Sequence, residues 1–158
     1  MIYIFSIVMA ASTAGADVQK TPTGLSIQYM QCEADQKLEQ LVLFLKNHQD
    51  EKVIVYFLTC SCVDFFHLAL KRLGPQFIPS VKVHALHGRM KQAAREATLE
   101  AYTSQPAGCL LCTDLAARGL DIPDVNWIVQ VDPPQVLLIW NIKFTLNVDL
   151  RITLKKYT

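Results

Sequence analysis

A short polar stretch behind an apolar run holds the residue types that bind a phosphate and a ribose. Thr113 and Asp114 follow the run GCLLC directly, and Arg118, Gly119 and Asp121 come next along the chain. A helix that starts after a strand offers free N–H groups and the positive end of its dipole to a phosphate, while the Asp121 carboxylate suits a ribose hydroxyl. The same residues also suit capping, because Thr113 or Asp114 can begin a helix and Gly119 can end one. Local chemistry leaves both interpretations open.

A second stretch, LHGRMKQAARE, carries positive charge beside a glycine. Gly88 permits a close backbone approach, Arg89, Lys91 and Arg95 supply cationic groups, and Gln92 adds an amide. Contacts to a polynucleotide backbone come from basic side chains and backbone N–H groups, so this segment predicts a nucleic-acid surface. The alternative is a solvated helix face whose basic side chains are balanced by the glutamates that follow in the same helix.

Alternating strand and helix patterns must position these two stretches. Continuous or alternating apolar runs predict strands, and apolar residues at a spacing of three and four predict helices. Such alternation indicates an α/β fold with a mainly parallel sheet and helices on both faces. In such sheets the ligand surface lies at the carboxyl ends of the strands, where the polar clusters of this chain fall. The strands are expected at 25–31, 52–58, 81–86, 108–113 and 126–131, and the helices at 34–48, 61–73, 91–102 and 114–118.

Composition excludes several classes of protein. A net charge of +1 requires a local basic patch rather than a uniformly basic surface if the partner is a polyanion. Five cysteines, an odd number, do not suit the disulfide framework of a small secreted domain. Cys109 and Cys112 should point to opposite faces of a strand, and Cys60 and Cys62 are spaced too tightly for a zinc knuckle. We therefore expect buried free thiols and no metal site.

Residues 1–22 are expected to form an irregular leader outside the domain. The opening MIYIFSIVMAA is apolar but lacks the basic region that begins a signal peptide. It is also too short to cross a membrane as a helix. A weak secretory signal stays open as an alternative, because small residues follow. No other stretch reaches membrane length, so no membrane partner is expected.

Taken in order, these segments resemble the second RecA-like domain of DEAD-box ATP-dependent RNA helicases. The stretches VIVYFLTCSCVDFF, ALHGRMKQAAREATLEAY and LLCTDLAARGLDIPDV resemble three of the family's motifs. The resemblance assigns residues 23–135 to a partial domain and implies a three-layer RecA-like fold, incomplete at its C-terminal end. The stretch TPTGLSIQYMQCEADQKLEQLV is similar to the subgroup tied to large ribosomal subunit assembly. That similarity implies pre-ribosomal RNA as a partner and a nuclear or nucleolar location, with the cytoplasm as the alternative.

The resemblance also implies a role for each matching residue. Contacts with the RNA backbone are expected from Gly88, Arg89, Gln92, Arg95 and Thr113. Gly119 and Asp121 would lie at the cleft between two RecA-like domains, with Asp121 on the ATP ribose. Asp114 and Arg118 would brace the motif and the contact between domains. No catalytic residue or metal ligand is expected in this chain, and ATP with Mg²⁺ belongs to the complete two-domain enzyme.

Two parts of the family's machinery are missing from these residues. There is no G-x-x-x-x-G-K-[ST] phosphate loop and no D-E-A-D tetrapeptide, both of which the family's first domain carries. After Gln135 relatives continue into motif VI, the source of the arginine finger, whereas residues 136–158 match no family motif and are read as a non-family tail. The chain is therefore expected to be half of a helicase that neither hydrolyses ATP nor unwinds RNA alone. The alternatives are a non-catalytic RNA- or protein-binding fragment and an inert truncated gene product.

Overall fold

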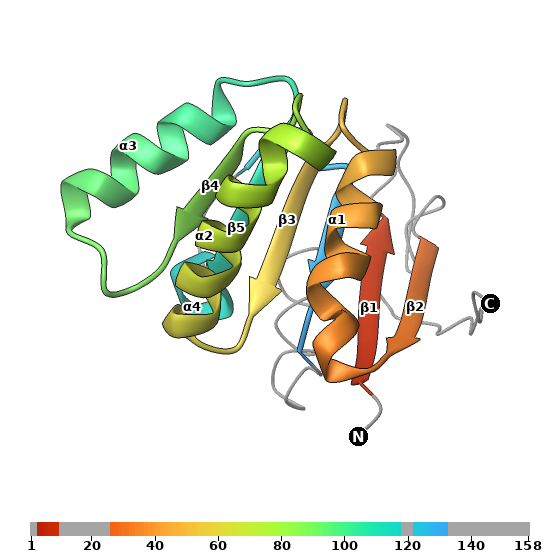
Figure 1. Cartoon of the computed structure of the whole chain (residues 1–158). Coiled ribbons are helices and arrows are strands. Elements are labelled where there is room, and N and C mark those ends of the chain that lie inside the picture. Colours follow the sequence, from red (N-terminus) through yellow and green to blue (C-terminus); the bar gives the residue numbers. More distant parts are fainter. Residues whose placement is uncertain (1–2, 10–25, 118–121, 133–158) are drawn as a thin grey trace, which may run out of the picture.

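The computed structural model describes residues 3–9, 26–117 and 122–132, and its strands and helices alternate through most of the chain (Figure 1). Every strand and helix that the sequence predicts is present, within a few residues of its expected bounds. The strands are β1 Tyr3–Met9, β2 Ser26–Cys32, β3 Lys52–Phe57, β4 Val83–Leu86, β5 Gly108–Thr113 and β6 Trp127–Gln130. The helices are α1 Lys37–Asn47, preceded by a 3-10 turn at Ala34–Gln36, α2 Cys60–Phe77, α3 Gln92–Thr103 and α4 Asp114–Ala117.

The described strands form one six-stranded sheet in the order β2-β1-β6-β3-β5-β4. Strands β6, β3, β5 and β4 are parallel to one another. Strand β1 is antiparallel to both of its neighbours, β2 and β6. The mainly parallel sheet that the sequence predicts is therefore confirmed, and the carboxyl ends of its parallel strands lie at one edge.

Strand β1 corrects the expectation of an irregular leader over residues 1–22. Its seven residues pair with β2 from Tyr3↔Cys32 to Met9↔Ser26, and its second half pairs with β6. The sequence YIFSIVM is rich in β-branched and aromatic residues, which favour strands. A position between two strands also gives hydrogen-bond partners to backbone groups on both sides. The remaining leader residues, 1–2 and 10–22, lie outside the described residues.

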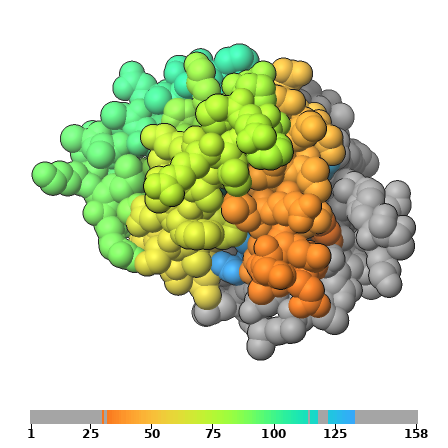
Figure 2. Space-filling view, in the orientation of Figure 1, coloured from red at the N-terminus to blue at the C-terminus, as the bar shows by residue number. Residues whose placement is uncertain are grey.

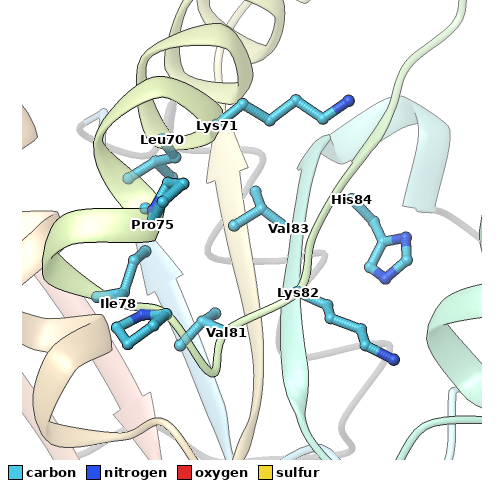
Figure 3. A pocket seen from close by; sticks show the side chains of 10 residues that line it. Leu70, Lys71, Pro75, Ile78, Val81, Lys82, Val83 and His84 are labelled. Carbon is cyan, nitrogen blue, oxygen red and sulfur yellow. The ribbon is translucent and has the colours of Figure 1, made fainter.

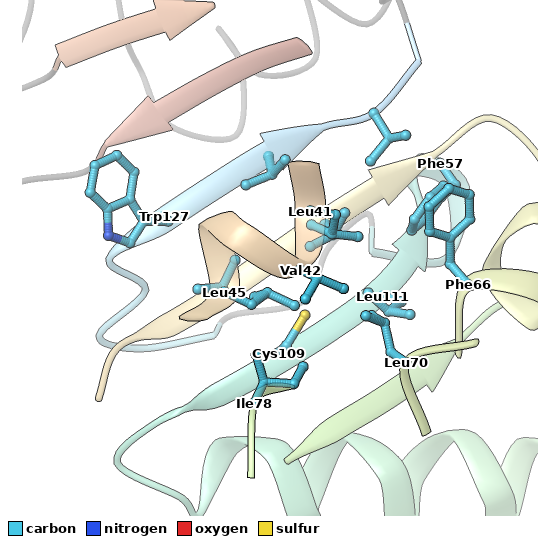
Figure 4. Packing of buried hydrophobic residues seen from close by; sticks show 14 of the residues in the cluster. Leu41, Val42, Leu45, Phe57, Phe66, Leu70, Ile78, Cys109, Leu111 and Trp127 are labelled. Atoms are coloured by element: carbon cyan, nitrogen blue, oxygen red, sulfur yellow. The ribbon is translucent and has the colours of Figure 1, made fainter. Parts of the chain in front are cut away.

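Helices cover both faces of the sheet, which gives the predicted three layers. On one face α1 and α2 pack over the sheet, with Leu41 and Leu45 near Cys109 and Leu111 (Figure 4). On the other face α3 and α4 pack over a second cluster that contains Cys112 and the fully buried Tyr102. Cys109 and Cys112 thus point to opposite faces, as predicted. The Tyr102 hydroxyl donates a hydrogen bond to the Val53 carbonyl at 3.0 Å.

Helix α2 extends one turn beyond residue 73, where the sequence predicts its end. Gly74 is buried within the helix, and Pro75 lies in its last turn. The helix ends at Phe77, and the N–H of the next residue, Ile78, donates to the Gly74 carbonyl at 2.8 Å. Because the Ile78 side chain is buried in the core, packing holds this last turn against the local preference of glycine and proline.

Candidate functional site

The carboxyl ends of β4 and β5 bring the two phosphate-suited stretches together. These strands are neighbours in the sheet, and Leu86 at the end of β4 pairs with Cys112, one residue before the end of β5. The LHGR segment and Thr113 therefore lie side by side at this end of the sheet. Phe57, at the end of β3, pairs with Thr113 in turn, so the segment that opens α2 lies at the same edge.

The turn after β4 leaves open space beside Gly88. A Cβ atom built on Gly88 would meet no atom within 4 Å, and the φ angle of this glycine lies outside the left-handed region. The Met90 N–H donates to the His87 carbonyl at 3.2 Å and closes the turn. The turn itself does not require glycine for its backbone conformation. The free space beside Gly88 is what the close approach of a ligand backbone requires.

Two side-chain contacts tie this turn to the start of α2. Arg89 Nη2 donates to Ser61 Oγ at 2.7 Å, and His87 Nε2 lies 2.9 Å from Asp64 Oδ1. His87 is buried, whereas Asp64 is exposed. Ser61 and Asp64 are three residues apart and so share one helix face. Sequence reasoning missed both residues, although a polar pair at this spacing in the first turns of a helix was the available signal.

The start of α3 supplies the other predicted RNA contacts. Gln92 Nε2 donates to Glu96 Oε1 at 2.7 Å, within the same helix. Arg95 is partly buried, and its Nε atom has no hydrogen-bond partner among the described residues. The Gln92–Glu96 contact joins a neutral amide to a carboxylate, so it does not decide between a nucleic-acid surface and a charge-balanced helix face. Gly88, Arg89, Gln92 and Arg95 thus form one continuous stretch at this edge.

The stretch that follows β5 is described only in part. Thr113 is the last residue of β5 and is 7% exposed, and Asp114 begins α4. Arg118, Gly119 and Asp121 lie outside the described residues, so their expected roles stay predictions. Leu115, on α4, is 74% exposed. The edge therefore combines polar segments with at least one uncovered apolar side chain.

The loop after β6 joins α1 to the same edge. Lys37 Nζ donates to Asp132 Oδ1 at 2.9 Å, and Asp132 Oδ2 accepts a hydrogen bond from the Leu58 N–H at 3.0 Å. Figure 2 shows the blue atoms that end the described chain at the surface between α1 and the start of α2. Asp132 directly follows the strand that the sequence predicts at 126–131. The structure gives it a bracing role at the ends of β3 and β6.

No cation site is found in the part of the chain that the structure describes. Within residues 3–9, 26–117 and 122–132 no group of three histidine, cysteine, aspartate or glutamate side chains is placed to hold a metal ion. The five cysteines are free thiols, and burial raises the pKa of the Cys109 thiol. A buried thiol with a raised pKa stays protonated, which disfavours metal binding. None of the described helices has the length and hydrophobicity needed to span a bilayer.

Comparison of the sequence with known proteins identifies a family. Residues 34–150 match the family of helicase conserved C-terminal domains. The match continues past Gln135, where we expected the family resemblance to end. The chain is 49% identical over 116 residues to DEAD-box ATP-dependent RNA helicase 18 of Arabidopsis thaliana, which covers 73% of this chain and 19% of that protein. It is 46% identical over 121 residues to the human ATP-dependent RNA helicase DDX55, covering 77% of this chain and 19% of that protein.

Solved structures agree with this sequence match. The E. coli DEAD-box protein SrmB, bound to regulator of ribonuclease activity A, is 29% identical with a TM-score of 0.55, covering 65% of this chain and 56% of that one. Dbp5 of S. cerevisiae, bound to RNA and ADP BeF3, has the same fold, with 24% identity, a TM-score of 0.60 and coverage of 69% and 27%. The chain spans about a fifth of the length of the curated relatives it matches. It belongs to the family of helicase conserved C-terminal domains, in the form that DEAD-box RNA helicases carry.

Proposed function

We propose that this chain supplies the RNA-backbone contacts and the ribose side of the ATP site of an ATP-dependent RNA helicase. The observation that carries the proposal is the adjacency of the LHGR segment and Thr113 at the ends of β4 and β5. Phosphate contacts come from basic side chains, glycine-permitted backbone approach and helix starts. These features lie together at this edge, on Gly88, Arg89, Gln92, Arg95 and Thr113.

The contacts of the turn support a preformed RNA surface. Ser61 holds the Arg89 guanidinium, and Asp64 holds the His87 ring. A guanidinium held by one hydrogen bond keeps other N–H groups for a phosphate oxygen. Because α2 positions this turn before RNA arrives, less conformational entropy is lost on binding. Thr113, being mostly buried, would contact a phosphate only from the floor of the surface.

The nucleotide side of the proposal requires a second RecA-like domain. Leu58 and Leu115 follow the neighbouring strands β3 and β5 and are 52% and 74% exposed. Exposed apolar side chains at a functional edge suit an interface between domains. In that assembly ATP and Mg²⁺ would lie in the cleft, with Asp121 on the ribose and Gly119 beside it, and with Asp114 and Arg118 bracing the contact. This chain alone would neither hydrolyse ATP nor unwind RNA.

The biological setting is part of the same proposal. The sequence similarity to helicases tied to large ribosomal subunit assembly suggests pre-ribosomal RNA as the substrate and the nucleus or nucleolus as the location. Nothing in the proposed RNA contacts reads a base, since backbone contacts carry no sequence information. Selection of pre-ribosomal RNA would therefore come from regions other than this edge.

Binding of single-stranded RNA tests the proposal directly. Fluorescence anisotropy of a labelled oligouridine with the purified chain should show binding that weakens as salt rises, because phosphate contacts release counterions. Arg95→Ala should weaken binding severalfold, and Lys46→Ala on the exposed end of α1 serves as the matched control.

Three outcomes would overturn the proposed RNA contacts. The first is RNA binding that does not weaken as salt rises. The second is an equal loss of RNA affinity in Arg95→Ala and Lys46→Ala. The third is a chain that unfolds cooperatively, and so is folded, yet binds no RNA. The last outcome would favour an inert or purely protein-binding fragment.

A further inference from the structure

The outer face of α2 carries large apolar side chains that the fold leaves uncovered. Phe65 and Leu68 are 61% and 52% exposed, whereas Phe66 and Leu70, on the inner side of the same helix, are buried. In Figure 2 the side chains of α2 lie at the front of the molecule, beside those of α1. Because Phe65 and Leu68 are three residues apart, they are neighbours on the helix surface and form one apolar pair.

Phe65 is exposed, but the core holds its ring in place. The ring meets the Phe66 ring edge to face, with 5.4 Å between the two centroids. Phe66 in turn contacts the buried Phe57, with 4.7 Å between their centroids. A side chain that is already held in one position loses little conformational entropy when a partner covers it.

The charged residues of this face are divided between the two ends of the apolar pair. Asp64 precedes the pair, Lys71 and Arg72 follow it, and all three are exposed. Asp64 contacts His87 through Oδ1 alone, and its side chain is 57% exposed. Lys71 extends away from α2 in a different direction from its neighbour Leu70, which is buried in the core (Figure 3). The face is therefore acidic at one end, apolar in the middle and basic at the other end.

Such a face is complementary to a second copy of itself that runs in the opposite direction. Two antiparallel α2 helices, related by a two-fold axis between Phe65 and Leu68, bring Phe65 of one copy against Leu68 of the other. Asp64 and Lys71 are two helix turns apart and share one flank of α2. Each Asp64 then faces Lys71 of the second copy. A parallel pair would instead set Asp64 against Asp64 and Lys71 against Lys71, which repels.

From this pattern we propose that α2 pairs, antiparallel, with α2 of a second copy of the chain. One helix face from each copy makes a small interface, so the pairing is weak and depends on protein concentration. The pairing does not require RNA. Because α2 begins at the carboxyl end of the sheet, antiparallel helices place the two candidate RNA edges at opposite ends of the pair.

Sedimentation equilibrium of the full chain, without RNA, tests the pairing over a wide range of protein concentration. The parent chain should shift from monomer to dimer as its concentration rises. Leu68→Glu puts a charge into the apolar centre and should weaken self-association about tenfold or more. Ala97→Glu adds the same charge to an exposed position of α3, on the other face of the sheet, and should leave self-association unchanged. Thermal unfolding of each variant shows whether it is folded.

Exchange of charges tests the direction of the pairing. Asp64→Lys and Lys71→Glu should each self-associate severalfold more weakly, because each variant sets like charges face to face. A mixture of the two variants should form a heterodimer, in which both flanking pairs again have opposite charges.

Three outcomes would overturn the proposed pairing. The first is a parent chain that stays monomeric at millimolar concentration, which would leave this face of α2 to a different partner. The second is equal self-association of Leu68→Glu and Ala97→Glu. The third is a mixture of Asp64→Lys and Lys71→Glu that associates no better than either variant alone, which would exclude the antiparallel arrangement.

Discussion

The two ends of the sheet are held together in different ways. At the carboxyl end, pairs of side chains join separate elements, namely Arg89–Ser61, His87–Asp64 and Lys37–Asp132. At the amino end, Lys52 is 3% exposed and donates from Nζ to the carbonyls of Thr103 and Pro123, at 3.0 and 3.4 Å.

This difference shows how one sheet serves two purposes. The amino end closes the fold with a buried cation that caps the end of α3 and fixes the loop before β6. The carboxyl end combines exposed polar residues, Ser61, Asp64 and Arg89, with buried ones such as His87 and Thr113. Loss of a contact should therefore cost stability at the amino end and binding at the carboxyl end, which the following variants test.

Leu111→Ala should have the largest effect, because Leu111 belongs to the hydrophobic core that supports both ends of the sheet. Leu111 is fully buried in the centre of β5, and truncation of such a leucine costs about 2–5 kcal/mol of unfolding free energy. Urea unfolding followed by circular dichroism measures this loss. Leu68, on α2, is 52% exposed, so Leu68→Ala should change the unfolding free energy by less than about 0.5 kcal/mol. Similar losses in both variants would mean that the assigned core is wrong.

Lys52→Met should affect the amino end alone. The variant keeps the apolar stem but leaves the Thr103 and Pro123 carbonyls without their donor, which costs about 1–3 kcal/mol. RNA affinity, measured well below the unfolding temperature, should stay unchanged. Lys46→Met is the control for loss of an exposed lysine. A stable Lys52→Met with weakened RNA binding would reverse the comparison between the two ends.

Asp64→Asn should affect the carboxyl end alone. The neutral amide holds the His87 ring less firmly than the carboxylate does, so the LHGR turn is less ordered before binding. We expect RNA affinity to fall by about two- to fivefold, the loss of one modest hydrogen bond, with little change in unfolding midpoint. Asp50→Asn, in the turn before β3, is the matched control. Unchanged affinity across the accessible pH range would show that Asp64 does not position the turn.

His84→Gln should give the smallest effect, seen only in the pH dependence of stability. Burial lowers the pKa of His84 in the folded chain. The unfolded chain therefore takes up the proton first, and stability that is complete above about pH 6.5 falls as the pH drops towards the folded pKa. The variant should lose less stability than the parent chain between about pH 8 and pH 5.5 in thermal unfolding. An equal loss of stability in the parent chain and the variant would mean that His84 contributes nothing to the pH dependence of stability.

The architecture was predictable because its signals are local. Apolar periodicity located α1 and β3, and the strand–helix alternation placed the LHGR segment and Thr113 at one edge. The partners of that edge were not predictable, since the Ser61–Arg89 and Asp64–His87 contacts depend on the rotation of α2 over the sheet. The extended end of α2 was missed for a similar reason. Burial of Ile78 is a tertiary effect, which overrides the local preference of Gly74 and Pro75.

The position of β1 also sets the order in which the sheet can form. Residues 6–9 pair with residues 127–130, so this strand leaves the ribosome long before its partner in β6 exists. Contacts between residues so far apart in sequence slow folding, because closing the long loop between them costs chain entropy before the pairing adds any stability. Until then β1 can pair with β2 alone, so the backbone groups on its other side lack their partner strand. The inserted strand thus delays completion of the sheet until residues 127–130 have been synthesised.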